Sequence, residues 1–228
     1  MYPNDIMFAA SPLRWISHIV FILQIMYSGA TRIVTSSTPN AELFCQYIKK
    51  YRATKFFGVV GLLSEMVSIA RTKHPGCLDS LRQIISGGEV VTQKLRSEIE
   101  SLLKGVAVIS VYGMSEMAGV VAGNEFFKDK SINGGNLKYG FKYKVVDNDK
   151  NPLGPEEMGV LCIKFDGGYF GYQSNEKANK EAFLKGGWYY TGDFVNISSD
   201  GIIEVYGRVK DNIWCDGKLM YVIYDTIM

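Results

Sequence analysis

The sequence is poor in the residues that form metal sites and disulfide frameworks. It has only four cysteines, Cys45, Cys77, Cys162 and Cys215, and no two of them fall within ten residues of each other. The two histidines are far apart, and there is no Cys-x-x-Cys pair. This spacing does not favour a zinc site, and the low count fits a reducing compartment, with the cysteines acting as small apolar side chains.

A dominant charge is also lacking, because 25 Lys and Arg stand against 23 Asp and Glu, a formal net charge of +2. That balance does not predict a nucleic acid or an anionic membrane as the main partner. The most apolar window, Trp15–Tyr27, is interrupted by polar residues and is shorter than the about 20 residues of a transmembrane helix. We interpret it as a buried helix whose residues, including Ile19 and Leu23, pack in the core, with the lining of a ligand pocket as the alternative.

Neither end of the sequence carries a recognisable targeting signal. Met1–Asp5 has no basic run before an apolar one, and Asp225–Met228 is not a peroxisomal tripeptide. We therefore expect an intracellular protein, and the compartment, cytoplasmic or another, stays open. The oligomeric state stays open at this point.

The first half of the chain alternates helix and strand patterns. Asn40 can cap a helix, and Gly105 ends a later amphipathic one that carries Leu95 and Ile99 on its apolar face. Strands are predicted at Lys55–Val60, Leu81–Ser86 and Val106–Val111, and further helices at Leu43–Tyr51 and Leu62–Arg71. Strand–helix–strand crossovers of this kind build parallel sheets with helices on both faces.

From about Asn124 the pattern changes, because Gly and Asn become dense and short strands replace helices. Phe141–Asp147 and Gly159–Phe165 are predicted strands, and Asp200-Gly201 is a strong hairpin signal. The predicted fold class is α/β, a partial parallel sheet flanked by helices, followed by a small β-barrel subdomain. The predicted parts are residues 1–125 with the parallel sheet, residues 126–206 as the barrel, and residues 207–228 as a hinge and the beginning of a further domain.

Two glycine-containing segments follow predicted strands. Gly87-Gly88 and Tyr112-Gly113 each come at a strand end, where open parallel sheets bind ligands. Glycine lets a flat ligand lie against the backbone, and a tyrosine can stack on its other face, so the four residues could form a slot for a purine ring. Taken separately, each segment is also compatible with an ordinary turn.

Polar residues follow the second of these segments directly. Ser115 could donate a hydrogen bond to a phosphate oxygen, and Glu116 could hold Mg²⁺, which prefers hard oxygen ligands. As a plain structural feature, the serine could equally cap a helix.

Two further segments carry charged side chains. In Thr191-Gly192-Asp193, a carboxylate at a tight turn can accept both hydroxyls of a ribose. In Gly207–Asp211, Arg208 offers a planar fork for a hydroxyl or a phosphate, and Lys210 lies where a domain hinge could follow the last strand. A turn aspartate and a solvated charged turn are the structural alternatives.

Taken in order, the motifs Tyr112–Glu116, Thr191–Asp193 and Gly207–Asp211 resemble those of the adenylate-forming superfamily. That superfamily includes acyl-CoA synthetases, 4-coumarate–CoA ligases and beetle luciferases, and the chain looks most like the insect luciferase-like members. The resemblance extends from about Phe8 to Gly217.

The resemblance implies a role for each matching residue. Adenine would be contacted by Gly87, Gly88, Tyr112 and Gly113. The α-phosphate would be bound by Ser115, magnesium by Glu116, the ribose by Asp193, and the nucleotide also by Arg208. Lys210 would lie at the hinge between domains. It also implies a two-step reaction in which a carboxylic acid, in particular a fatty acid, attacks ATP to form an acyl-adenylate, and coenzyme A then displaces AMP. Ser115 and Glu116 would act in that chemistry, which requires neutralisation of a pentavalent phosphate.

The chain also departs from the family pattern. No stretch resembles the phosphate loop Ser-x-Gly-Thr-Thr-Gly-x-Pro-Lys, and the catalytic lysine of the family's C-terminal domain is not reached. Phe8–Trp15 has no aromatic-histidine pair near the acyl pocket, and Trp214 stands where relatives often have lysine. We therefore expect a truncated ligase with low or no activity as an isolated chain.

Two other functions stay open. The first is a non-catalytic paralogue that binds a nucleotide or an acyl group as a sensor or scaffold. The second, weaker alternative is a luciferase-like monooxygenase, against which Trp214 and the missing lysines argue.

Overall fold

The computed structural model describes residues 1–36, 38, 40–89, 91–123, 134–168, 171–211, 213–215 and 218–220. These residues form two compact units: unit 1 is Met1–Gly119, and unit 2 is Val120–Gly123 together with the described residues from 134 onward. The predicted change of pattern at Asn124 lies outside the described residues. The predicted boundaries at residues 125 and 206 stay predictions.

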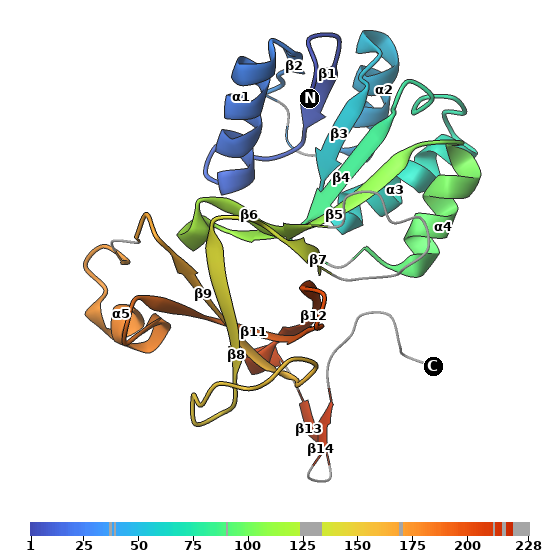
Figure 1. The fold of residues 1–228 in the computed structure, drawn as a ribbon. Helices are drawn as coiled ribbons and strands as arrows, with labels where there is room; N and C mark the ends of the chain where they lie inside the picture. The colour runs from blue at the N-terminus through green and yellow to red at the C-terminus, as the bar shows by residue number, and fades with distance from the viewer. Residues whose placement is uncertain are drawn as a thin grey trace. The chain divides into compact units, whose positions relative to one another are not determined.

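Unit 1 contains a parallel sheet, as the alternating pattern predicts. Its strand order is β2-β1-β3-β4-β5, and every neighbouring pair is parallel (Figure 1). The strands are β1 (Ile6–Ala9), β2 (Thr31–Ile33), β3 (Lys55–Gly58), β4 (Gln83–Gly87) and β5 (Ala107–Met114). The sequence pattern did not predict β1 and β2, which have four and three residues.

Helices cover both faces of this sheet (Figure 1). α2 (Ala41–Tyr51), α3 (Val60–Thr72) and α4 (Gln93–Leu102) pack on one face, and α1 (Ile16–Ser28) packs on the other. The predicted cap at Asn40 is confirmed, because its side chain accepts a hydrogen bond from the Leu43 backbone N–H at 2.9 Å. The Thr92 hydroxyl caps α4 in the same way.

The pleat of the strands divides the apolar residues between two cores. In β1, Phe8 points into the core under α2 and α3, while Met7 and Ala9 point toward α1. The larger core holds fully buried aromatic rings, among them Phe8 and Phe44 in an edge contact with centroids 4.8 Å apart. Cys45 and Cys77 are buried there too, and burial raises the pKa of both thiols.

α1 is the helix predicted at Trp15–Tyr27, but the prediction that it is buried is wrong. Only Phe21 and Ile25 are buried, whereas Trp15 is 46% exposed, Leu23 60% and Tyr27 96%. Composition shows that a helix is apolar, but it does not show whether both of its faces have partners. None of the helices in the described part of the chain combines the length and apolar character needed to cross a bilayer.

Unit 2 is built on antiparallel strands in the order β6-β7-β12-β11-β9-β8, with β10 paired to β11. They are β6 (Gly119–Gly123), β7 (Gly134–Leu137), β8 (Phe141–Val146), β9 (Gly159–Phe165), β10 (Phe183–Leu184), β11 (Trp188–Ile197) and β12 (Ile202–Arg208). The predicted strands at Phe141 and Gly159 and the hairpin at Asp200-Gly201 are confirmed. The expected loss of helices is wrong, because α5 (Glu176–Ala182) begins at Asn175, whose side chain caps it.

The sheet of unit 2 curls so that its two outer strands approach each other. The Tyr143 hydroxyl on β8 lies 2.8 Å from the Val121 carbonyl on β6 and 3.0 Å from the Lys138 carbonyl. Burial raises the pKa of Tyr143 to about 12, so the hydroxyl keeps its proton for these acceptors. Among the described strands the closure is made by this side chain rather than by a ladder, which gives a barrel-like but open sheet.

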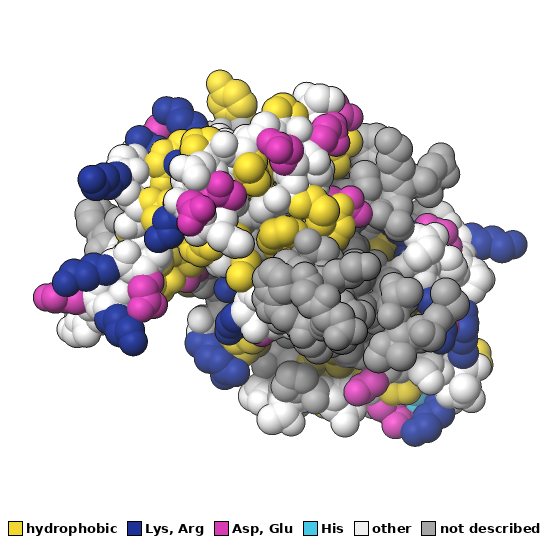
Figure 2. Space-filling view, turned by 90° about the horizontal axis from the view of Figure 1, so that it is seen from below, with side chains coloured by type: hydrophobic (Ala, Val, Ile, Leu, Met, Phe, Trp, Pro, Cys, Tyr) yellow, Lys and Arg dark blue, Asp and Glu magenta, His cyan; other side chains and the backbone are white. Residues whose placement is uncertain are grey.

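Acidic and basic side chains are both scattered over the face drawn in Figure 2. This mixture agrees with the nearly even charge balance of the sequence.

Candidate nucleotide-binding site

β4 ends at Gly87, and this glycine is required by packing inside the sheet. Gly87 is paired with Val111 on β5, and an added Cβ would lie 2.8 Å from the Val111 Cγ2 and 3.0 Å from the Val111 carbonyl oxygen. A side chain at this position would therefore collide with the neighbouring strand. The resemblance implies that Gly87 contacts the adenine. The close approach of Val111 is a second, structural reason for a glycine at this position.

Gly88 is different from its neighbour. Its φ is +89°, a left-handed conformation that glycine adopts without strain, and an added Cβ would meet no atom within 4 Å. The backbone therefore turns sharply after β4 and leaves open space beside Gly88. At the end of β4, a flat group could therefore approach the main chain beside Gly88.

Tyr112 and Gly113 do not form a strand-end turn, and this part of the prediction is wrong. β5 continues through both residues to Met114, so it is longer than the predicted Val106–Val111. The β-forming residues Val111 and Tyr112 favour this continuation. Tyr112 is half-buried and Gly113 is exposed.

The chain turns immediately after β5. Ser115 and Glu116 lie in a short 3₁₀ helix, η1 (Ser115–Met117), followed by Ala118 in the left-handed region with φ +56°. Both residues therefore follow the carboxyl end of β5 directly; Ser115 is exposed and Glu116 is half-buried. Among the described residues there is no group of three His, Cys, Asp or Glu side chains that could hold a metal by themselves.

Thr191-Gly192-Asp193 lies within β11, not at a tight turn between elements. Tyr190 pairs with Cys162 and Phe194 with Val160, so three residues of β11 face the single residue Leu161 of β9. Gly192 takes φ +73° to make this bulge possible. The predicted turn aspartate is therefore a bulge aspartate inside a strand.

The Thr191 hydroxyl replaces the ladder bonds that the bulge removes. It donates to the Leu161 carbonyl at 2.9 Å and accepts from the Asp193 backbone N–H at 3.0 Å. Because Thr191 is buried, water could not replace its hydroxyl as the hydrogen-bond partner of these two backbone groups. No separate role was predicted for Thr191. A threonine or serine directly before a glycine within a strand could have indicated a bulge stabilised by the hydroxyl.

Asp193 and Arg208 are brought into direct contact. They are opposite each other on β11 and β12, and Arg208 Nε lies 2.7 Å from Asp193 Oδ1. Asp193 is 4% exposed, whereas the Arg208 side chain is 52% exposed. Arg208 Nη1 also donates to the Thr191 carbonyl at 3.4 Å, so one guanidinium holds both the carboxylate and the bulge.

Lys210 lies in η2 (Val209–Asp211), directly after β12, with its side chain exposed. The backbone then forms β13 (Ile213–Cys215), paired with β14 (Lys218–Met220). Trp214 belongs to β13, but its side chain lies outside the described part of the structure, as does Gly217. The hinge role of Lys210 stays a prediction.

The predicted site residues thus fall into two groups. Gly87, Gly88, Tyr112, Gly113, Ser115 and Glu116 belong to unit 1, around the ends of β4 and β5. Asp193, Arg208 and Lys210 belong to unit 2, where the first two form an ion pair.

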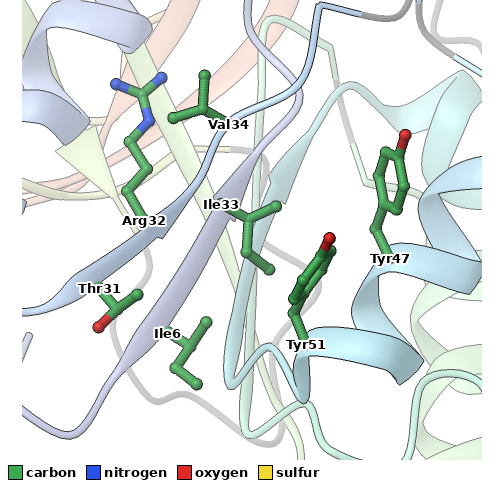
Figure 3. Close-up of a pocket in the computed structure, with 7 residues that line it drawn as sticks. All are labelled: Ile6, Thr31, Arg32, Ile33, Val34, Tyr47 and Tyr51. Carbon is green, nitrogen blue, oxygen red and sulfur yellow. The ribbon is translucent and has the colours of Figure 1, made fainter.

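A hollow of about 480 Å³ in unit 1 shares no residue with either group. It lies at the edge of the sheet between β2 and α2, and β1 and β3 separate β2 from β4. Tyr47 and Tyr51 project into it (Figure 3).

Comparison with known proteins gives the family of the chain. The family model described as AMP-binding enzyme matches residues 1–172, which is most of the sequence. The chain belongs to the AMP-binding enzyme family.

Individual relatives agree with this assignment. The acyl-CoA synthetase ALT10 of Alternaria alternata is 28% identical over 221 residues, which cover 84% of this chain and 38% of that protein. The crystal structure of the anthranilate CoA ligase AuaEII with anthranoyl-AMP has a TM-score of 0.86 at 20% identity, and the match covers 96% of this chain and 42% of that one. The O-succinylbenzoate coenzyme A synthetase (MenE) of Bacillus subtilis, with ATP and magnesium, has a TM-score of 0.79 at 24% identity, covering 95% of this chain and 44% of that one.

These coverages show that the chain spans less than half the length of the curated relatives it matches. The structural likeness confirms the fold class.

Proposed function

We propose that the chain supplies the nucleotide-binding part of an ATP-dependent carboxylate-activating ligase. The substrates are ATP and a carboxylic acid, with a fatty acid as the first candidate, and coenzyme A is the acceptor of the acyl group. The observation that carries the proposal is the bulge that holds Asp193 against Arg208 within a chain of the AMP-binding enzyme family.

The ribose role is assigned to Asp193. A carboxylate offers more acceptor sites than a single guanidinium N–H occupies, so it can bind Arg208 and ribose hydroxyls together. The bulge and the ion pair fix the direction of the carboxylate before ligand arrives, which reduces the entropy lost on binding. Arg208 keeps a half-exposed guanidinium that can also reach the nucleotide.

The adenine role is assigned to the ends of β4 and β5. Gly88 leaves space against the main chain, and Tyr112 provides an aromatic face from the next strand. A purine inserted between a backbone and an aromatic ring gains stacking without needing a charged partner.

The phosphate and metal roles are assigned to η1. Ser115 can donate to the α-phosphate, and Glu116 can ligate Mg²⁺. A single protein carboxylate fits this ion, because Mg²⁺ commonly takes one or two carboxylates and completes its shell with phosphate oxygens and water. When bound, the ion would neutralise charge on the transferring phosphate.

We also propose that the 228-residue chain by itself turns over slowly. It contains no segment like the lysine-ended phosphate loop, so a large part of the positive charge needed around the pentavalent phosphate is lacking. Pyrophosphate exchange driven by a fatty acid tests this point. Exchange at the rate of a full-length acyl-CoA synthetase would overturn it.

The ribose assignment is tested by calorimetric titration of the chain with ATP and with 2′,3′-dideoxy-ATP. We expect Asp193→Ala to weaken ATP binding by about 10- to 100-fold, the range for a hydrogen bond to a charged group. Wild type should bind dideoxy-ATP as weakly as the variant binds ATP. The variant itself should not distinguish the two nucleotides, because the interaction that reads the hydroxyls has been removed.

Asp166→Ala is the matched control, because Asp166 is an exposed aspartate of unit 2 outside the site. It should bind ATP like wild type, and thermal unfolding should show that all variants are folded. If Asp193→Ala still prefers ATP over dideoxy-ATP, the ribose role is wrong. Nucleotide binding without any pyrophosphate exchange, even in a full-length protein, would favour the non-catalytic binding function instead.

A further inference from the structure

Ser86 on β4 is buried more completely than any other polar side chain in the described part of the chain. None of its surface is exposed, whereas the other buried polar and charged residues there keep 4% to 9%. Because side chains alternate between the two faces of a strand, Ser86 points like Ile84 into the core under α2, α3 and α4. Such a position favours an apolar residue, and a buried hydroxyl there requires a hydrogen-bond partner.

The partner of Ser86 is the end of the neighbouring strand. Its hydroxyl donates a hydrogen bond to the Gly58 carbonyl oxygen at 3.0 Å. Gly58 is the last residue of β3, and its pairing with Ser86 is the last pair that joins β3 to β4. Since Gly58 has no side chain of its own, the serine hydroxyl provides a side-chain contact between these two strand ends.

This hydrogen bond lies two residues before the turn at Gly88. After Ser86, β4 makes one more pair, Gly87 with Val111 on β5, and the chain then turns at Gly88 with φ +89°. The end of β4 is therefore held by backbone pairing on the β5 side and by the serine hydroxyl on the β3 side. Its position sets the distance between the open space beside Gly88 and Tyr112 on β5.

The same device occurs in unit 2. Thr191 is also a buried hydroxyl residue directly before a glycine, and it donates to the Leu161 carbonyl of the neighbouring strand at 2.9 Å. That bond fixes the bulge that carries Asp193. In each unit, a buried hydroxyl anchors one strand to the next beside a residue proposed for the nucleotide.

We propose that Ser86 is a positioning residue of the nucleotide site. Its hydrogen bond fixes the end of β4, so that Gly88 and Tyr112 keep the spacing that a purine ring needs. Ser86 does not contact the ligand, because its side chain points into the core. The inference rests on the proposed adenine role of Gly88 and Tyr112. Without the hydroxyl, the strand end shifts and stacking on the base weakens, while the contacts to ribose and phosphate remain.

Displacement of a fluorescent ATP analogue by ATP and by UTP tests the proposal, because the two nucleotides share ribose and triphosphate and differ only in the base. Wild type should bind ATP more tightly than UTP, since a purine stacks over a larger area. Ser86→Ala should weaken ATP binding by about 2- to 10-fold, the range for one hydrogen bond. It should leave UTP binding nearly unchanged, so the ratio of the two affinities falls.

Ser80→Ala is the matched control. The Ser80 hydroxyl donates to the Ala53 carbonyl at 2.8 Å, a bond of the same kind between the segments that precede β4 and β3, at the end of these strands opposite to Gly88. Ser80→Ala should lower the thermal stability but keep the wild-type ratio of affinities. Ser86→Cys keeps the size of the side chain with a weaker donor, so it should lower the ratio too and replaces the alanine variant if that does not fold.

The inference is overturned if Ser86→Ala keeps the wild-type ratio, if Ser80→Ala lowers the ratio equally, or if Ser86→Ala loses ATP and UTP affinity alike. Failure of the proposed function looks different, because wild type itself would then bind ATP no better than UTP, and the adenine role would fall together with the inference. A double variant with Gly88→Asn adds a last test. Losses of ATP affinity smaller than the sum of the two single losses would support a shared strand end, and fully additive losses would overturn it.

Discussion

The two units hold their predicted nucleotide-site residues in different physical ways. In unit 1 the parallel strands end, and the space beyond them is available because Gly88 turns the main chain without a side chain. In unit 2 the strand does not end, so β11 interrupts its own ladder with a bulge to orient Asp193. Unit 1 therefore offers mainly backbone shape, and unit 2 offers a charge held in place by Thr191 and Arg208.

The largest effect is expected in unit 1, from Gly87→Val. The new side chain meets Val111 on the neighbouring strand, and overpacking of this kind costs about 1–3 kcal/mol. Gly88→Asn is the matched variant, because asparagine tolerates the left-handed region and the space beside Gly88 is open. It should keep most of the stability and lose nucleotide affinity. Urea unfolding measures the loss of stability and ATP titration the loss of affinity. If both variants lost the same stability, Gly87 and Gly88 would not differ in the way described.

The next effect concerns the bulge of unit 2. Thr191→Val keeps the shape of the side chain but leaves the Leu161 carbonyl and the Asp193 N–H without their partner. We expect a loss of about 1–3 kcal/mol in the free energy of unfolding, typical of unsatisfied buried polar groups. Thr191→Ser retains the hydroxyl and should recover most of it. If valine and serine behave alike, the hydroxyl does not lock the bulge.

A smaller, pH-dependent effect is expected from Asp5 in unit 1. Burial by itself would raise its pKa, but the Tyr2 backbone N–H at 2.8 Å, Lys55 at 3.5 Å and the Thr54 hydroxyl together lower it below the ordinary value of 3.8. A carboxyl whose folded-state pKa is lowered stabilises the fold above its unfolded pKa, and this contribution is lost as pH falls through the folded pKa. Unfolding free energies measured from neutral pH downward should therefore decline less steeply for Asp5→Asn than for wild type in the acid range. Parallel curves would show that Asp5 does not contribute.

The smallest effect is expected from an exposed ion pair of unit 2. Lys142 Nζ lies 3.3 Å from Asp166, but both side chains are mostly in solvent. Asp166→Ala should change the free energy of unfolding by no more than about 0.5 kcal/mol, because water screens such pairs. Thermal unfolding at low and high salt checks this, and a clear salt-dependent loss would show that the pair is more than a surface contact.

Several elements could be predicted well from the residues. β8 and β9 begin at the predicted residues because a polar turn separates two runs of β-forming side chains, and Asp200-Gly201 specifies a hairpin locally. Asn40 specifies the start of α2 through a bond to a residue three positions away. In each case the interaction that sets the structure is short in sequence.

The residues proposed for the candidate site come from sequence motifs, but their geometry could not be predicted from those motifs. The motifs single out Asp193 and Arg208, yet their spacing in sequence does not show that they face each other across two strands. Nor does it show that Thr-Gly-Asp is a bulge, because a glycine and an aspartate are also the residues of an ordinary turn. The extension of β5 through Gly113 was missed for the same reason.

The sequence by itself determined the family and the alternation of strand and helix in unit 1, because these depend on local patterns and on motifs that stay together in the chain. It also supplied the residues that we propose for a nucleotide site. Only the tertiary structure decided what surrounds each residue. It showed that Gly87 serves strand packing, that Thr191 locks the bulge under Asp193, and that the apolar α1 has one face in the core and one in solvent. Burial and pairing depend on segments far apart in the sequence, and no local pattern records which of them meet.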